Sequence, residues 1–165
     1  MIELIVLDVD GTLTDGKITY TNNGDEVKSF DVSDGLAIAV WTKKFGKKAA
    51  IITGRKSSLV EKRANELGIK HLYQGVDNKD EVLENILKKE DISWHQVAAI
   101  GDDLNDYKML KKAGLSFTPQ NGSKYIKDIV NVVCKNSGGD GAVREMMEYI
   151  FKEDGLEEEF LSLWQ

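Results

Sequence analysis

Apolar residues recur along the chain in short runs, separated by longer stretches with helical spacing. The first run, Ile2 to Leu7, is interrupted only by Glu3 and is typical of a buried strand. Comparable runs predict six strands, over residues 2–8, 48–53, 70–75, 96–101, 114–118 and 130–135. The intervening segments predict helices over 34–45, 56–67, 80–90, 103–112, 122–128 and 140–152. This alternation indicates an α/β fold, a doubly wound and mainly parallel sheet with helices on both faces.

Residues 17–32 break the alternation. Two β-rich arms flank Asn23-Gly24, a dipeptide that favours a tight hairpin turn. Because this segment directly follows the first strand, we expect a flap over about 17–33 that stands above the strand ends. The chain has no linker, repeat or low-complexity segment, so we expect one domain over residues 1–165, with a C-terminal tail over about 153–165.

Charge and composition narrow the class of protein. The 165 residues carry a formal net charge of -6, which argues against binding to the phosphate backbone of a nucleic acid. The single cysteine, Cys134, excludes a disulfide within the chain and fits a reducing compartment. No apolar run approaches the roughly 18 residues of a membrane span, and no signal-type segment leads the chain. We therefore expect a soluble cytoplasmic protein.

Polar residues gather where the predicted strands end. Asp8 and Asp10 follow the first strand, where buried carboxylates are costly unless paired or bound to a cation. Residues 53–55 (Thr-Gly-Arg) follow the second strand, 77–79 (Asp-Asn-Lys) the third, and 102–106 the fourth. Ligands of open parallel sheets bind beyond the carboxyl ends of the strands. We expect these loops to converge on one pocket, with the carboxylates around a hard cation.

This set of residues suits phosphoryl transfer. Mg²⁺ prefers oxygen ligands, which Asp8 and Asp102 can supply as carboxylates and Asp10 as a backbone carbonyl. Asp8 is the candidate nucleophile, and Asp10 can act as general acid and base. Thr53 and Lys79 would stabilise the charge on the phosphoryl oxygens.

Four motifs in order, DVDGT (8–12), Thr53, Lys79 and GDDLND (101–106), resemble those of the haloacid dehalogenase superfamily of phosphatases. The resemblance implies that Asp103 and Asp106 lie beside the metal, without direct contact or through water. Many members carry an inserted cap domain, for which the stretches 10–53 and 79–102 have no room. We expect a capless member whose site is open to a large substrate or closed by another subunit.

Longer segments narrow the resemblance. LTDGKITYTNNGDEVKSFDVSDGLAI, TGRKSSLVEKRANELGI, HLYQG and GAVRE resemble the 3-deoxy-D-manno-octulosonate 8-phosphate (KDO 8-phosphate) phosphatase family. Its members are capless, tetrameric, Mg²⁺-dependent hydrolases of lipopolysaccharide precursor synthesis. The resemblance implies hydrolysis through an aspartyl-phosphate, and substrate contacts from Asp10, Asp31, Val32, Ser33, Asp34, Gly35, Arg55, Arg63 and Lys79.

The tail GLEEEFLSLWQ (155–165) places large apolar side chains among acidic ones. Such a group is a liability in water. It can pack on its own domain, but we expect it to dock on a neighbouring subunit of a homotetramer, near that subunit's site.

Two departures from the family pattern leave alternatives open. Ala39 and Asp140 stand where relatives often carry basic residues, and losing positive charge near an anionic ligand can redirect substrate choice. One alternative is therefore a phosphatase of a nine-carbon sugar acid 9-phosphate, of the sialic acid or KDN type. A more distant one is a non-enzymatic phospho-acceptor or scaffold module. The order of the motifs differs from that of receiver modules, and the spare carboxylate of Asp10 favours turnover.

Overall fold

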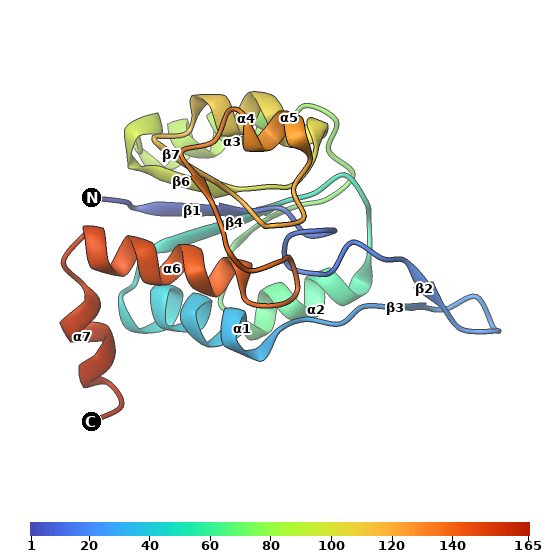
Figure 1. Cartoon of the computed structure of the whole chain (residues 1–165), viewed down its shortest axis with the longest axis horizontal. Helices are drawn as coiled ribbons and strands as arrows, with labels where there is room; N and C mark the ends of the chain where they lie inside the picture. Colours follow the sequence, from blue (N-terminus) through green and yellow to red (C-terminus); the bar gives the residue numbers. More distant parts are fainter.

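Six parallel strands form the central sheet of the computed structural model, which describes residues 1–165 (Figure 1). The α/β fold predicted from the sequence is confirmed, and each strand lies within its predicted range. The order across the sheet is β5 (His71–Tyr73), β4 (Lys48–Ile52), β1 (Leu4–Leu7), β6 (Val97–Ile100), β7 (Leu115–Thr118) and β8 (Val132–Val133).

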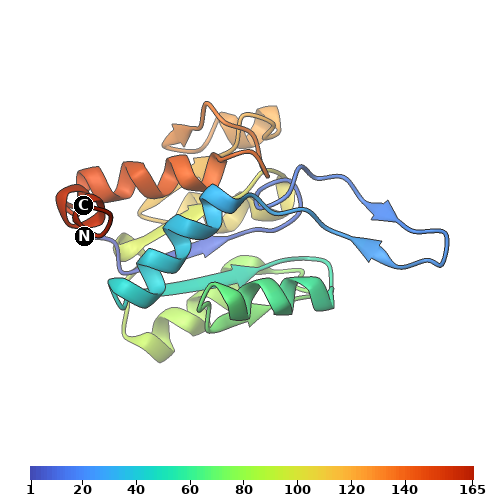
Figure 2. The same ribbon diagram turned by 90° about the horizontal axis from the view of Figure 1, so that it is seen from below.

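Helices cover both faces of the sheet (Figures 1 and 2). One face packs against α1 (Val32–Ala39), α2 (Ser58–Glu66) and α6 (Ala142–Glu153), and the other against α3 (Lys79–Glu90), α4 (Tyr107–Lys112) and α5 (Lys124–Lys127). Along β1, Ile5 and Leu7 join the first core, while Leu4 and Val6 join the second. Because both faces of β1 are buried, its sequence is a continuous apolar run rather than an alternating one.

The strand order creates a crevice between β1 and β6. The chain builds the sheet outward from β1 in one direction through β4 and β5, and then in the other through β6, β7 and β8. Leu7 and Ile100 are register partners at the carboxyl ends of β1 and β6. The residues that follow these two strands therefore lie next to each other at the point where ligands of such sheets bind.

A two-stranded hairpin, β2 (Thr19–Tyr20) and β3 (Glu26–Val27), projects beyond this edge (Figure 2). Its turn runs over residues 22–24, with Gly24 at a φ of 84° and its N–H donating to the carbonyl of Thr21. A three-residue turn that ends on a left-handed glycine is a common way to close a hairpin. The body of the hairpin extends away from the sheet, and only its base reaches the strand ends.

The helix predicted over residues 34–45 is not uniform. It begins as α1 and continues as a π-helix over Val40–Lys44, where the N–H of Phe45 donates to the carbonyl of Val40. The hydroxyl of Thr42 donates to the carbonyl of Leu67 (2.6 Å) and also lies near that of Ile38 (3.2 Å). Its bond to Leu67 joins the π-helix to the end of α2.

The tail forms a short helix, α7 (Glu157–Ser162), beside the end of α6 (Figure 1). Phe160 is 5% exposed and stacks on Phe151, with ring centroids 4.7 Å apart. Leu161, Leu163 and Trp164 remain exposed. Two apolar residues of the tail, Phe160 and the partly buried Leu156, thus pack on their own chain, while three face outward.

Short connections join the remaining elements. Two 3-10 helices, Trp94–Gln96 and Leu104–Asp106, precede β6 and α4. Between β1 and β4 the chain forms only the hairpin, α1 and the π-helix, and between β5 and β6 only α3 and a 3-10 turn, so there is no cap domain. The longest helices, α3 and α6, have 12 residues each, and the structure contains no candidate for a membrane-spanning helix.

Candidate active site

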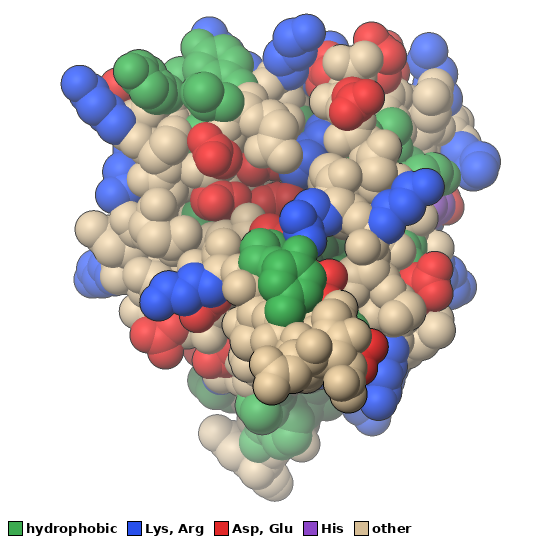
Figure 3. Space-filling view, turned by 90° about the vertical axis from the view of Figure 1, so that its right-hand side faces the viewer, with side chains coloured by type: hydrophobic (Ala, Val, Ile, Leu, Met, Phe, Trp, Pro, Cys, Tyr) green, Lys and Arg blue, Asp and Glu red, His purple; other side chains and the backbone are tan.

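A polar pocket of about 250 Å³ opens at the carboxyl edge of the sheet. Figure 3 faces this edge, where acidic side chains lie in a hollow above the projecting hairpin. Loops after β1, β4 and β6 supply its whole lining, which contains no hydrophobic residue: Asp8, Asp10, Gly16, Thr53, Gly54, Arg55, Asp102, Asp103 and Asn105. A wider hollow of about 470 Å³ beside α2 contains a single carboxylate, Glu61, and no comparable cluster.

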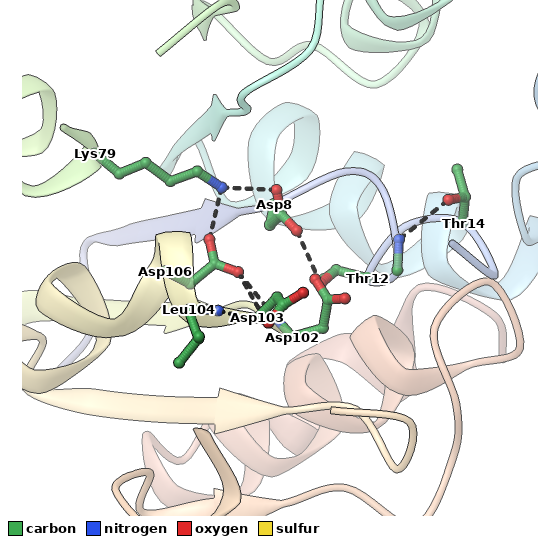
Figure 4. Close-up of polar contacts among 9 residues, drawn as sticks. Asp8, Thr12, Thr14, Lys79, Asp102, Asp103, Leu104 and Asp106 are labelled. Atoms are coloured by element: carbon green, nitrogen blue, oxygen red, sulfur yellow. Dashed lines mark hydrogen bonds and ion pairs between the residues drawn. The ribbon is translucent and has the colours of Figure 1, made fainter. Parts of the chain in front are cut away.

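Lys79 lies beneath this pocket and binds one carboxylate that lines it, Asp8, and a second, Asp106, that does not (Figure 4). Its Nζ donates to Asp8 Oδ1 (2.8 Å) and to Asp106 Oδ1 (2.6 Å). All three side chains are buried, with Lys79 only 1% exposed. As the first residue of α3, Lys79 comes from the opposite half of the sheet to Asp106. The structure therefore places Lys79 inside the cluster and not on the surface.

Asp106 organises the loop after β6. Its Oδ2 accepts the backbone N–H groups of Asp102 (3.0 Å) and Asp103 (3.3 Å), while its Oδ1 accepts from Lys79. Asp103 caps the 3-10 helix by accepting the N–H of Leu104 (2.8 Å). Because the oxygens of Asp106 are already engaged, its role in the structure is to hold the loop that aims Asp102 at Asp8.

The carboxylates of Asp8 and Asp102 face each other across the hydroxyl of Thr12. Thr12 Oγ1 lies 3.5 Å from Asp8 Oδ2 and 3.3 Å from Asp102 Oδ1. Burial raises the pKa of Asp8 to about 7; Lys79 opposes this shift and Asp102 adds to it. Burial also raises the pKa of Asp102 and, with the charge of Asp8, that of Asp106 to about 6. The single positive charge of Lys79 does not compensate for the carboxylates of buried Asp8, buried Asp106 and half-buried Asp102.

The turn after β1 depends on Gly11. This residue has a φ of 92°, and a Cβ built on it would overlap the carboxylate of Asp102. Glycine adopts this left-handed conformation without cost and leaves the space free. The side chain of Asn121 braces the turn from the other side, donating to the carbonyl of Gly11 (2.9 Å) and accepting the N–H of Gly138 (2.7 Å).

Asp10 is held by the hairpin. Its Oδ1 accepts from Lys28 Nζ (2.6 Å), which also binds Glu26 (2.9 Å) at the base of β3. Arg55, which lines the pocket, lies 3.7 Å from the same carboxylate oxygen of Glu26. Sequence reasoning assigned no role to Lys28 or Thr12. For Lys28, the available signal is its two-residue spacing from Glu26, which puts both on one face of a strand.

The predicted substrate turn, residues 31–35, forms a separate cluster. Asp31 caps α1 by accepting the N–H of Asp34 (3.0 Å), and its carbonyl accepts from Arg63 Nη2 (3.2 Å). Arg144 of α6 donates its N–H to Asp34 (2.8 Å) and its guanidinium to the carbonyl of Ser33 (3.3 Å). None of these residues lines the pocket that contains Asp8, so the structure does not bring the turn and Arg63 together with the aspartates.

The two departures from the family pattern also lie outside the pocket. Ala39 ends α1 and packs against the first core, while Asp140 is exposed in the loop before α6.

The carboxylate cluster fits a small hard cation. One oxygen each from Asp8, Asp102 and Asp106 lies within 4.8 Å of the others. The carboxylates of buried Asp8 and half-buried Asp102 face each other with raised pKa values, so they need an additional positive charge to ionise together. Their oxygens, with the backbone carbonyl of Asp10 nearby in sequence, are the ligand type that Mg²⁺ prefers.

Comparisons with known proteins point to one group. A profile of haloacid dehalogenase-like hydrolases matches residues 71–146. The 3-deoxy-D-manno-octulosonate 8-phosphate phosphatase KdsC of Escherichia coli K12 is 43% identical over 155 residues, which cover 93% of this chain and 81% of the relative.

Solved structures agree with the sequence comparison. The Moraxella catarrhalis 3-deoxy-D-manno-octulosonate 8-phosphate phosphatase, in complex with magnesium, phosphate and KDO, superposes with a TM-score of 0.95 at 41% identity, over 99% of this chain and 94% of that one. The cobalt-bound phosphatase of Haemophilus influenzae gives a TM-score of 0.89 at 35% identity, over 94% and 91% of the two chains.

Proposed function

The chain belongs to the KdsC family of 3-deoxy-D-manno-octulosonate 8-phosphate phosphatases, within the haloacid dehalogenase-like hydrolases, and we propose that it hydrolyses KDO 8-phosphate to KDO and phosphate. It is thus a phosphoric monoester hydrolase that uses Mg²⁺. The observation that carries the proposal is the pair of carboxylates, buried Asp8 and half-buried Asp102, that meet at the crevice between β1 and β6 above Lys79.

Asp8, Asp102 and the backbone carbonyl of Asp10 would hold the metal. When bound, Mg²⁺ neutralises the charge that develops on the phosphoryl oxygens and draws the phosphate into the pocket. Asp106 and Asp103 support this group without taking part directly, because Asp106 binds Lys79 and the loop N–H groups while Asp103 caps the next turn.

Asp8 is the nucleophile in this proposal. One of its carboxylate oxygens attacks phosphorus, a bond to Asp8 forms, and the bond from phosphorus to the sugar oxygen breaks. Asp10 gives its proton to the departing sugar oxygen. The products of this half-reaction are the free sugar acid and an aspartyl-phosphate.

Water completes the reaction. Asp10, now ionised, takes a proton from a water molecule that attacks phosphorus, and the bond to Asp8 breaks. Phosphate leaves, Asp8 is again a carboxylate and Asp10 is again protonated. During both halves, Lys79 and Thr53 stabilise negative charge on the transferring group, Lys79 from its buried position 2.8 Å from Asp8.

The residues proposed to contact the sugar acid lie both inside and outside the pocket. Arg55 lies in the pocket beside Asp10 and suits an anionic group of the substrate. The turn Asp31–Gly35 and Arg63 lie outside the pocket, so we assign them to the part of the substrate that extends beyond it, in the same subunit or in a neighbouring one. Assembly into a homotetramer, with the tail near a neighbour's site, would cover the exposed Leu161, Leu163 and Trp164. The cytoplasm stays the predicted compartment, supported by the single buried thiol of Cys134.

A side-by-side assay of eight-carbon and nine-carbon sugar acid phosphates, with Mg²⁺ and with EDTA, tests this function. We expect Mg²⁺-dependent release of phosphate and a higher kcat/KM for KDO 8-phosphate. A higher kcat/KM for the nine-carbon 9-phosphate would instead support the alternative raised by Ala39 and Asp140. Absence of turnover on both would contradict the proposal.

A further inference from the structure

One lysine of the hairpin reaches the catalytic pocket. Lys28 follows β3 directly, and its side chain is 3% exposed. Burial alternates along this arm, so that Glu26 and Lys28 face inward while Val27 faces solvent. The ammonium group of Lys28 therefore lies between two carboxylates, 2.6 Å from Asp10 and 2.9 Å from Glu26.

The bond from Lys28 is the one hydrogen bond that the Asp10 side chain forms. The carboxylate otherwise borders the pocket and is 20% exposed. A short hydrogen bond from an ammonium group fixes both the position and the plane of a carboxyl group, and because it engages Oδ1 of Asp10 it leaves Oδ2 free to carry the proton. It also persists, because releasing Asp10 would leave the shielded ammonium group of Lys28 short of a partner.

We propose that Lys28 is the positioning residue for Asp10, and that through it the hairpin sets where the general acid of the reaction points. The inference rests on the proposed function, in which Asp10 protonates the departing sugar oxygen. Lys28 itself touches no reacting atom. In this view the base of the hairpin supports proton transfer although none of its residues lines the pocket.

Two substrates with different leaving groups can distinguish positioning of Asp10 by Lys28 from any other role of Lys28. A sugar oxygen is a poor leaving group as an alkoxide and needs the proton from Asp10, a contribution of roughly 10²- to 10⁴-fold in rate. The p-nitrophenolate ion is stable and departs without a proton. A variant in which Asp10 is misplaced should therefore be slow to form the aspartyl-phosphate from KDO 8-phosphate but not from p-nitrophenyl phosphate.

The test compares Lys28→Met with Lys17→Met, a matched control that removes an exposed lysine from the other arm of the same hairpin. For each variant, kcat, KM and the Mg²⁺ concentration for half-maximal rate are measured with KDO 8-phosphate. The first turnover of p-nitrophenyl phosphate is followed separately by rapid mixing.

In Lys28→Met we expect kcat on KDO 8-phosphate to fall by roughly 10- to 100-fold, part of the full general-acid contribution. KM, the Mg²⁺ requirement and the p-nitrophenolate burst should match those of Lys17→Met. An equal loss in the burst would overturn the inference, because Lys28 would then act on the phosphoryl group, the metal or the fold. Unchanged kcat in Lys28→Met, with the parent active, would overturn it and leave the proposed function intact. An inactive parent would instead contradict the proposed function.

The variant Lys28→Met/Glu26→Gln removes a second explanation. Without Lys28, the carboxylates of Asp10 and Glu26 repel each other, and this repulsion alone could move Asp10. The glutamine substitution removes the repulsion but supplies no bond to Asp10. We expect the double variant to remain slow on KDO 8-phosphate. Recovery of the parental kcat would show that Lys28 only screens charge, which contradicts a positioning role.

Discussion

The buried carboxyl of Asp8 should make the metal-free protein less stable as the pH rises. Burial raises the pKa of Asp8 from 3.8 to about 7 against the opposing charge of Lys79. Between these pH values the folded protein keeps a proton that the unfolded chain has lost. Stability from this group is therefore fully present below about pH 4 and is lost as the pH rises through 7. At about 1.4 kcal/mol per pKa unit, the loss amounts to about 4 kcal/mol.

Mg²⁺ should offset most of this loss. A cation held by Asp8 and Asp102 binds the ionised carboxylates, and at 100 times its dissociation constant it would add about 2.7 kcal/mol of stability. The variant Asp8→Asn has nearly the same shape but cannot ionise. Without metal at about pH 8, we expect it to be more stable than the parent, to gain little from Mg²⁺, and to have no turnover.

Urea unfolding at about pH 4 and about pH 8, each with EDTA or saturating Mg²⁺, measures these differences. Asp34→Asn is a matched control, since burial also raises the pKa of Asp34 to about 6 but this residue lies outside the carboxylate cluster. Its contribution should persist when Mg²⁺ is present. A metal-free parent whose stability stays constant or rises between the two pH values would refute the reasoning, as would an Asp8→Asn variant less stable than the parent at the higher pH.

Two further substitutions and one deletion test other parts of the account. Gly11→Ala should lose Mg²⁺-dependent activity because the added Cβ overlaps Asp102, whereas the control Gly24→Ala, at a similar φ of 84°, places its Cβ where no atom lies within 4 Å. Both variants should lose about 1–3 kcal/mol of stability in urea. Full activity of Gly11→Ala would contradict the steric argument. Lys79→Met leaves two buried carboxylates unpaired, so we expect no turnover. Without metal, its free energy of unfolding should fall by about 3–5 kcal/mol at neutral pH and by less in acid. A loss of stability independent of pH would argue against this cause. Deleting residues 156–165 removes the Phe160 contact with Phe151 and should cost about 3 kcal/mol while impairing assembly or activity; an unchanged oligomer by analytical ultracentrifugation, with unchanged kinetics, would contradict a role for the tail between subunits.

The sheet and the convergence of its loops follow from local patterns. Apolar runs place β1 and β6 in a parallel sheet, and the doubly wound order then makes them neighbours, so that Asp8 and Asp102 meet whatever the details of packing. The burial of Lys79 is harder to predict from the sequence. Lysines are frequent in this chain, and Lys79 differs from the others only because it begins α3 beneath the pocket.

Features that depend on tertiary contacts could not be predicted in the same way. The bond from Lys28 to Asp10 joins the hairpin to the β1 loop, and its geometry depends on how the two arms leave the sheet. Within the π-helix after α1, the hydroxyl of Thr42 donates to the carbonyl of Leu67, 25 residues away in sequence, a contact that no local pattern predicts. Phe160 packs on its own chain because α6 ends beside it, which the apolar composition of the tail does not determine.

The aspartyl-phosphate on Asp8 is the most direct test of the account. The enzyme is mixed with ³²P-labelled KDO 8-phosphate and Mg²⁺, quenched in acid during the first turnover and reduced with borohydride, which converts an acyl phosphate at Asp8 into homoserine. We predict acid-stable label on the protein and homoserine at position 8, both absent with EDTA and in Asp8→Asn. Label on another residue, or turnover of the substrate with no trapped phosphoenzyme and no homoserine at position 8, would contradict the central claim.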